Sequence, residues 1–271
     1  MNEKIRLWEN GTPLFEPEYG QEEPYIMTNL LDNGKKDNPC VIVIPGGGYS
    51  CVCCDHEGDK ICRFLNENGY SAFYLMYRVE PYHFPCMELD AKRAIRLVRF
   101  NAEKFNIDPD RIGITGFSAG GHLTCMAGLR FDYGLENGDE IDKVSSRPDT
   151  AAPCYAVASL DKTIAHMGTR CNFLGEDNSD ERAFAFSSEN IVPNDAPPFF
   201  MFHTAADEAV PVECSLRLAK ALADKKISFA LHVFPYGPHG VGLGTDTPLA
   251  DDWPVLYVKW MNEVYKRARK Q

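Results

Sequence analysis

The sequence has no long hydrophobic run, no excess of positive charge and no nucleotide-binding glycine motif. Its longest apolar stretches, such as 40–44 and 72–77, are far too short to cross a bilayer. The formal net charge of -11 repels nucleic-acid backbones and anionic membrane surfaces, so neither is an expected partner. The spacings G-x-x-x-x-G-K-[ST] and G-x-G-x-x-G do not occur, which argues against a phosphate-cradling loop.

The N-terminal residues MNEKIRLWEN also lack the apolar core of a signal peptide. The 10 cysteines could indicate a disulfide framework, but a chain of 271 residues without an export signal is better explained by reduced thiols. We therefore expect a cytoplasmic protein. The composition is ordinary for a globular chain that buries a core, and it leaves the oligomeric state open, a homo-oligomer included.

Short β-branched runs alternate with segments of helical period, which predicts an α/β fold with a mainly parallel central sheet flanked by helices. We expect a single domain over residues 1–271, with antiparallel edge strands in 1–39. Within 131–195, the polar stretches 131–150 and 160–195 predict a small, irregular lid or rim. Strands are expected at 40–44, 71–77, 111–115, 155–157, 198–204 and 228–234, and helices at 57–68, after Pro85, and at 123–129, 211–224 and the C-terminus from Trp253.

The most informative segment is RIGITGFSAGG, in which Ser118 is the centre of a G-x-S-x-G pentapeptide. A β-run precedes it and an apolar helical run follows it. In that context the flanking glycines allow a sharp turn that leaves the Ser118 hydroxyl exposed at a helix N-terminus. We therefore interpret Ser118 as a nucleophile.

A second glycine-rich element, PGGGY at 45–49, comes directly after the strand CVIVI. Consecutive glycines let backbone N–H groups approach a ligand closely, as in an oxyanion hole. The predicted donors are the N–H groups of Gly47 or Gly48, together with that of Ala119, the residue after the nucleophile.

A triad in the chain order serine, acid, histidine needs two further side chains. Asp207 follows the expected strand at 198–204, and His239 lies in a glycine-rich loop after the last expected strand. Both therefore lie beyond the carboxyl ends of parallel strands, where such sheets build their sites. Glu208 is the alternative acid, and Asp195 is less suited because it precedes its strand.

For the remaining histidines and the cysteine-rich segment, we expect packing or loop positions, without a role in the triad or in metal binding. We expect His122 to pack in the core and His203 and His232 to lie in strands, whereas His56, His83 and His166 lie in loops where contact with substrate stays open. The segment Cys51–Cys62 lacks the paired C-x₂-C spacing of structural zinc sites, so we expect packed thiols and no metal. No cofactor is expected.

These motifs resemble the esterase/lipase branch of α/β-hydrolases that includes acetyl-xylan-esterase-like and feruloyl-esterase-like sugar esterases. The resemblance extends over most of the chain and includes VIVIPGGGY, DAKRAIRLVR, GFSAGGH, PPFFMFHTAADEAVPVECS and PHGVGL. It implies an α/β-hydrolase fold and a triad of Ser118, Asp207 and His239, in agreement with the residues themselves.

The expected function is that of a serine carboxylesterase whose partner is a small-molecule ester, most simply an acetylated xylo-oligosaccharide or related sugar. Candidate substrate-binding residues are Tyr49, Arg78 and Phe117, which adjoin the predicted site in sequence. A lipase or a peptidase of the same fold would share the triad. A non-catalytic binding protein of this fold usually lacks a triad member, and here all three are present.

Overall fold

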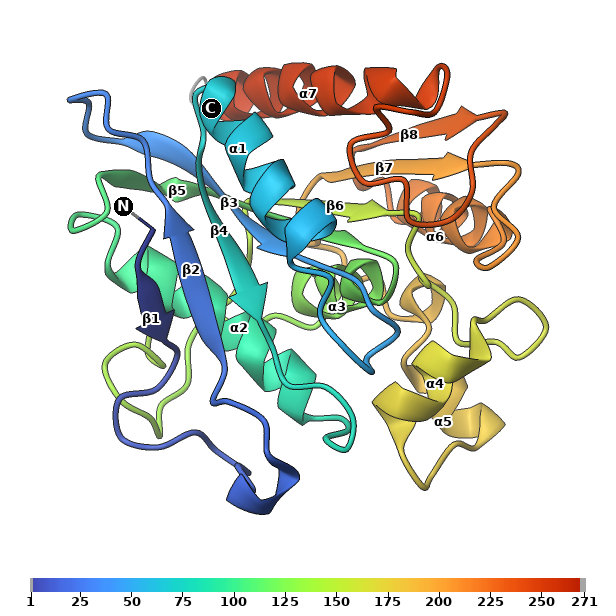
Figure 1. Cartoon of the computed structure of the whole chain (residues 1–271), viewed down its shortest axis with the longest axis horizontal. Coiled ribbons are helices and arrows are strands. Elements are labelled where there is room, and N and C mark those ends of the chain that lie inside the picture. The colour runs from blue at the N-terminus through green and yellow to red at the C-terminus, as the bar shows by residue number, and fades with distance from the viewer. Residues whose placement is uncertain (1, 269–271) are drawn as a thin grey trace.

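The computed structural model describes residues 2–268, and an eight-stranded sheet lies at its centre (Figure 1). The strands lie in the order β1-β2-β4-β3-β5-β6-β7-β8, and all pairs from β4 to β8 are parallel. β1 and β2 pair antiparallel at one edge, which confirms the edge strands predicted for 1–39. The strands are β1 (Lys4–Arg6), β2 (Tyr25–Asn29), β3 (Asn38–Ile44), β4 (Ser71–Met76), β5 (Ile107–Phe117), β6 (Thr150–Cys154), β7 (Phe199–Thr204) and β8 (Phe229–Phe234).

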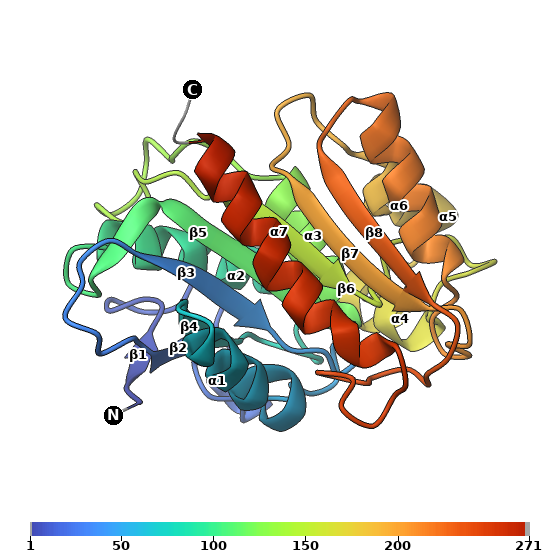
Figure 2. The same cartoon turned by 90° about the horizontal axis from the view of Figure 1, so that it is seen from above.

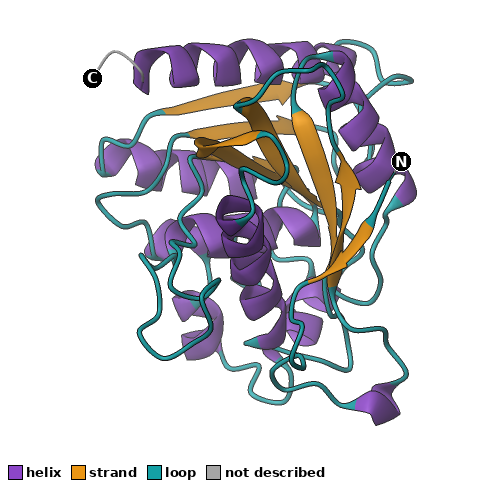
Figure 3. Ribbon diagram, turned by 90° about the vertical axis from the view of Figure 1, so that its left-hand side faces the viewer, coloured by secondary structure: helices purple, strands orange, loops and turns teal. Residues whose placement is uncertain are grey.

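Helices cover both faces of the sheet (Figure 2, Figure 3). α1 and α7 bury apolar side chains such as Leu65, Trp253 and Tyr257 against one face of the sheet. The apolar side chains of α2, α3 and α6 pack against the opposite face. The helices are α1 (Lys60–Glu67), α2 (Cys86–Phe100), α3 (Ala119–Leu129), α4 (Met167–Leu174), α5 (Asp180–Ala185), α6 (Glu213–Asp224) and α7 (Trp253–Ala268), with short turns η1 (Pro17–Tyr19), η2 (Asp55–Asp59), η3 (Ser188–Asn190) and η4 (Ala250–Asp252).

The central strands form because they are apolar on both faces. In β3, residues 40–44 are all buried, as expected for a strand that helices cover on both sides. The expected strand at 155–157 is wrong: β6 ends at Cys154, and the apolar residues after it belong to a buried connection. The stretch 160–195 is also more ordered than expected, since it contains α4 and α5. Within residues 2–268, no helix has the length and apolarity needed to span a membrane.

Candidate active site

Ser118 occupies the turn between β5 and α3 with a backbone φ of 55°, a conformation that non-glycine residues rarely adopt. The turn is tight on both sides. A Cβ atom at Gly116 would lie 2.2 Å from Thr124 Oγ1, and one at Gly120 would lie 2.1 Å from the carbonyl oxygen of Ile44. Only glycine fits at either position, so the G-x-S-x-G spacing is a direct requirement of this turn.

His239 and Asp207 lie in the loops after β8 and β7, and the fold brings both to Ser118. The distance from His239 Nε2 to Ser118 Oγ is 2.7 Å, and the distance from His239 Nδ1 to Asp207 Oδ2 is also 2.7 Å. The three predicted side chains therefore form one continuous hydrogen-bonded row. Glu208, the alternative acid, is exposed beside Asp207, and Asp195 accepts a hydrogen bond from Tyr133 instead.

The Asp207 carboxylate is fully buried and is held by several donors. The backbone N–H groups of Ala209 and Val210 donate to its Oδ1 atom at 3.0 and 2.9 Å. Burial alone would raise the pKa of Asp207, but hydrogen bonds from His203, His239 and Val210 outweigh it and hold the pKa well below its usual range. Asp207 is thus ionised at neutral pH and can orient the His239 ring.

The carbonyl groups of residues 45–48 are all engaged in hydrogen bonds, which fixes the orientation of the glycine loop. Asn172 on α4 donates to the Gly48 carbonyl at 2.9 Å and so ties the rim to this loop. The other donors are Tyr77 Oη to Pro45, the Cys53 N–H to Gly46, and the Ser50 and Cys51 N–H groups to Gly47.

The N–H of Gly46 is also occupied, since it donates to Glu57 Oε2 at 2.8 Å. Gly47 and Gly48 have φ values of 131° and 64°, and a Cβ atom at Gly47 would lie 2.2 Å from the Cys51 carbonyl oxygen. A Cβ atom at Gly46 would lie 2.9 Å from that of Ser118, so the loop packs directly against the serine turn. The predicted donors Gly47 and Gly48 therefore lie in the loop beside the serine turn, and the sequence pattern could not show that the Gly46 N–H is already occupied.

The proposed substrate-binding roles of Tyr49, Arg78 and Phe117 are corrected by the structure, because all three side chains lie in the interior. Tyr49 Oη is 2.8 Å from His122 Nδ1. Arg78 forms a buried bidentate ion pair with Asp90, which anchors α2 to the end of β4. Phe117 packs against the rings of Tyr155 and Trp253. Adjacency in sequence did not reveal these directions.

Most histidines other than His239 lie in the kind of element that the sequence predicted, but His56 lies on the turn η2 and not in an irregular loop. His122 is fully buried, and burial lowers its pKa to about 4, so it is neutral. His166 caps α4 and lies beside the glycine loop, where a Cβ atom at Gly48 would be 4.0 Å from its Cε1. His203 lies in β7 as expected, but its Nε2 is 3.4 Å from Asp207 Oδ2, a contact with the site that its position in a strand did not predict.

The cysteine-rich segment follows the glycine loop, and its thiols are less buried than expected. Cys51 is exposed, Cys53 and Cys54 are half-buried, and only Cys62 is fully buried. Burial and the neighbouring Cys51 raise the pKa of Cys53 to about 11, which disfavours the thiolate that binds metals. Among residues 2–268, no group of three or more His, Cys, Asp or Glu side chains has a metal-binding arrangement.

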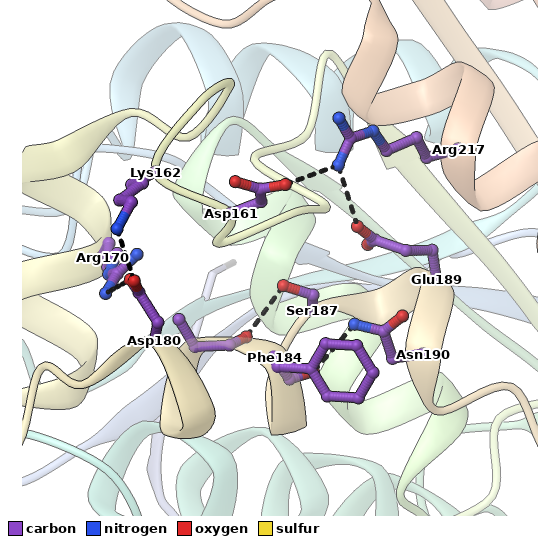
Figure 4. A pocket seen from close by; sticks show the side chains of 10 residues that line it. Asp161, Lys162, Arg170, Asp180, Phe184, Ser187, Glu189, Asn190 and Arg217 are labelled. Atoms are coloured by element: carbon purple, nitrogen blue, oxygen red, sulfur yellow. Dashed lines mark hydrogen bonds and ion pairs between the residues drawn. The ribbon is translucent and has the colours of Figure 1, made fainter.

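A cavity of about 340 Å³ lies on the rim, between α4, α5 and α6 (Figure 4). The triad residues are not part of its lining. Its cations are already paired: Arg217 with Asp161, and both Lys162 and Arg170 with Asp180. These ion pairs balance the charge of the cavity, so it does not present an unpaired cluster of one sign to a ligand.

The order serine, aspartate, histidine on a parallel sheet is the arrangement of α/β-hydrolases, and this molecule has that fold. The chain belongs to the BD-FAE family, whose model matches residues 29–222. Membership confirms the family resemblance inferred from the sequence.

Known proteins similar to this chain include enzymes that act on xylan. It is 37% identical over 248 residues to endo-1,4-beta-xylanase B of Butyrivibrio fibrisolvens, covering 89% of this chain and 38% of that protein. It is 30% identical to the acetylxylan esterase of Xylanibacter ruminicola, covering 80% of this chain and 46% of that protein. The chain therefore spans less than half the length of either relative.

A solved structure matches over nearly the whole of both chains. The acetyl ester-xyloside bifunctional hydrolase of Caldicellulosiruptor lactoaceticus superposes with a TM-score of 0.92 at 46% identity, covering 97% of this chain and 96% of that one. A sugar hydrolase from Lactococcus lactis superposes with a TM-score of 0.75 at 26% identity, covering 91% and 96%. The architecture is thus shared with hydrolases of similar length.

Proposed function

We propose that this chain is a serine carboxylesterase that hydrolyses small esters, foremost acetyl esters of xylo-oligosaccharides or related sugars. The observation that carries the proposal is the unbroken row from Asp207 through His239 to Ser118, with both separations at 2.7 Å. Such a row activates a hydroxyl that is otherwise a weak nucleophile.

In the proposed mechanism, His239 Nε2 accepts the Ser118 proton as Oγ attacks the ester carbonyl carbon. Asp207 holds Nδ1–H and stabilises the imidazolium that forms. The N–H groups of Ala119 and of Gly47 or Gly48 would donate to the oxyanion. When the tetrahedral intermediate collapses, the C–O bond to the alcohol breaks and His239 returns its proton to that leaving group. Water then attacks the acyl-enzyme by the same route and releases the acid.

The choice of sugar esters rests on similarity. Two relatives carry acetyl-ester hydrolysis in their names, and one of them matches 97% of this chain. The charge balance fits a neutral small-molecule ester better than an anionic polymer or membrane. A lipase would be expected to have a larger apolar lid, whereas the rim helices α4 and α5 have 8 and 6 residues.

The test is acetate release from acetylated xylo-oligosaccharides, alongside p-nitrophenyl esters, a peptide p-nitroanilide and a p-nitrophenyl xyloside. We expect turnover of the acetylated sugar by the wild-type chain and none by Ser118→Ala. Faster cleavage of the peptide would favour the peptidase alternative. If a serine-reactive phosphonate failed to label Ser118, the binding-protein alternative would replace the esterase.

A further inference from the structure

Glu57 lies on the single π-helical turn η2 beneath the glycine loop, and its side chain is only 3% exposed. Both carboxylate oxygens are used. Oε2 accepts the Gly46 N–H at 2.8 Å, and Oε1 accepts the Tyr155 hydroxyl at 2.6 Å. The nearest ion-pair partner is the partly exposed His56, at 3.8 Å from Oε1. Burying a carboxylate costs free energy, and here mainly neutral donors offset that cost. The position of the Glu57 carboxylate therefore depends on those donors.

Tyr155 extends this connection to the loop that carries His239. Its hydroxyl accepts the Gly242 N–H at 3.1 Å, and the Gly242 carbonyl in turn accepts Trp253 Nε1 at 3.0 Å. The Tyr155 ring also packs edge-on against the His239 ring, with centroids 5.2 Å apart. Burial, and then the nearby Glu57 charge, raise the pKa of Tyr155 well above its usual value, so the hydroxyl keeps its proton and donates to Glu57.

We propose that Glu57 is a positioning residue that, through Tyr155, sets the placement of the glycine loop relative to the loop of His239. The proposal rests on the function proposed above. The two loops lie far apart in the chain and supply the oxyanion donors and the general base, which act on the same carbonyl group. The path from Gly46 N–H through Glu57 and Tyr155 to Gly242 N–H is a buried connection between them.

This connection matters because catalysis depends on sub-ångström placement, whereas ground-state binding tolerates more movement. Gly46 packs against the Ser118 Cβ, so a shift of its peptide also moves the following Gly47 and Gly48. On the other side, Gly242 lies three residues after His239, in the connection between β8 and η4. Loss of the connection should therefore lower kcat more than it raises KM.

Three variants separate the parts of the connection. Tyr155→Phe keeps the ring against His239 and removes only the hydroxyl. Glu57→Gln keeps an acceptor for Gly46 and loses the second acceptor for Tyr155, so it should resemble Tyr155→Phe. Glu57→Ala loses both contacts. Tyr70→Phe is the matched control, because the Tyr70 hydroxyl is also buried and donates to Asn262 at 2.9 Å, but it lies away from both loops.

The experiment measures kcat and KM on p-nitrophenyl acetate, the thermal midpoint, and the rate at which a p-nitrophenyl phosphonate labels Ser118. We expect kcat to fall about tenfold in Tyr155→Phe and Glu57→Gln, with KM within about twofold, and no fall in Tyr70→Phe. The double variant Glu57→Gln/Tyr155→Phe should be no slower than the slower single variant, because both remove one link. Glu57→Ala should be slower still.

Additive losses in the double variant, or equal losses in Tyr70→Phe, would overturn the proposal. It would also fail if the Glu57 and Tyr155 variants lowered the thermal midpoint but kept the wild-type kcat, since that outcome indicates a purely structural role. The rate of phosphonate labelling tests this connection independently of whether the proposed esterase function is correct. If the wild-type chain is labelled at Ser118 but hydrolyses no ester, the esterase proposal fails, while the relative labelling rates of the variants still test the connection.

Discussion

The imidazole of His203 lies against the carboxylate of Asp207, with Nε2 3.4 Å from the same Oδ2 atom that His239 Nδ1 contacts at 2.7 Å. His203 is completely buried, and its Nε2 also lies 2.9 Å from the Val210 carbonyl oxygen. A carbonyl oxygen only accepts, so Nε2 must carry a proton, and Nδ1 accepts from the Ser215 hydroxyl at 2.8 Å. The Asp207 carboxylate therefore faces a fixed N–H group of His203 in addition to that of His239.

Replacing His203 with phenylalanine should test this contact. The ring volume is largely kept, but Val210 loses a donor and Asp207 loses one of the groups that hold its orientation. We expect kcat to fall about tenfold and the free energy of unfolding to fall by about 1–3 kcal/mol. The control is Ser215→Ala, which removes the partner of the distant ring nitrogen. Comparable kcat in His203→Phe and Ser215→Ala would show that the contact with Asp207 has no part in the reaction.

Ser118→Ala should lower ester hydrolysis by several orders of magnitude while the protein stays folded, because it removes the attacking oxygen. The measurement is kcat/KM on p-nitrophenyl acetate, with the thermal midpoint as the check on folding. Ser179→Ala, which deletes the N-cap of α5 away from the triad, should cost about 1 kcal/mol of stability and leave the rate unchanged. Retention of more than about a tenth of wild-type activity in Ser118→Ala would exclude Ser118 as the nucleophile.

The depressed pKa of Asp207 predicts how stability depends on pH. Its folded value lies below the unfolded value of about 3.9, so the interactions of the carboxylate stabilise the fold above about pH 4 and are lost as pH falls toward the folded pKa. Asp207→Asn removes this contribution. The stability advantage of the wild type over Asp207→Asn, measured by urea unfolding, should therefore be constant near neutrality. It should shrink as the pH falls below about 4.

Glu208, the exposed residue next to Asp207, provides a matched control when the activity of the Asp207→Asn variant is measured. Glu208→Gln should keep wild-type activity, whereas Asp207→Asn should lose about 10⁴-fold because the amide no longer fixes the productive tautomer of His239. A stability difference between wild type and Asp207→Asn that stays unchanged from pH 7 to pH 2 would contradict the ion-stabilised environment of Asp207.

The sequence could predict the triad because each of its members follows a strand in a recognisable turn. Ser118 is flanked by glycines that the fold requires, and Asp207 and His239 come after strands whose parallel order brings their ends together. The side-chain directions of Tyr49 and Arg78 could not be predicted, because they depend on partners such as His122 and Asp90 that come from distant segments.

The strand boundary near Tyr155 shows a second limit of the sequence. Residues 155–157 are as apolar as a strand, yet they form a buried connection, and Tyr155 takes a φ of 33° that ends β6. Apolar composition reports burial and does not separate a strand from a packed loop. The proposed role of Glu57 has no sequence signature either, because a carboxylate in a polar stretch shows its burial only once the groups that donate to it are located.

The short rim helices lead to a prediction about acyl chain length. α4 and α5 carry exposed polar and charged residues along with isolated apolar side chains such as Met167 and Phe184, which is a poor cover for a long alkyl chain. We expect a higher kcat/KM on acetyl than on octanoyl p-nitrophenyl esters. A preference for octanoate would favour a lipase, and measuring both esters below their critical micelle concentrations keeps the comparison valid.

The last prediction concerns Cys51, the exposed thiol beside the glycine loop. Its Sγ lies 3.7 Å from the Gly47 carbonyl oxygen, and a Cβ atom at Gly47 would come within 2.9 Å of it, so there is no free space on that side of the loop. A bulky group on Cys51 should push Gly47 away and displace an oxyanion donor. We expect alkylation with N-ethylmaleimide to lower kcat, by up to about 10²–10³-fold if one donor is lost completely.

Cys171 on α4 is also exposed and serves as the matched control, so the alkylation is compared in wild type, Cys51→Ser and Cys171→Ser. Cys51→Ser should protect the activity, and Cys171→Ser should not. Extended dialysis against EDTA or phenanthroline should leave the rate unchanged, because hydrogen bonds within the protein hold this loop. Loss of activity on chelation that zinc restores would show that the segment Cys51–Cys62 binds a metal. Full activity after verified modification of Cys51 would show that this thiol does not control the loop, since an adduct would then fit beside Gly47 without moving its N–H.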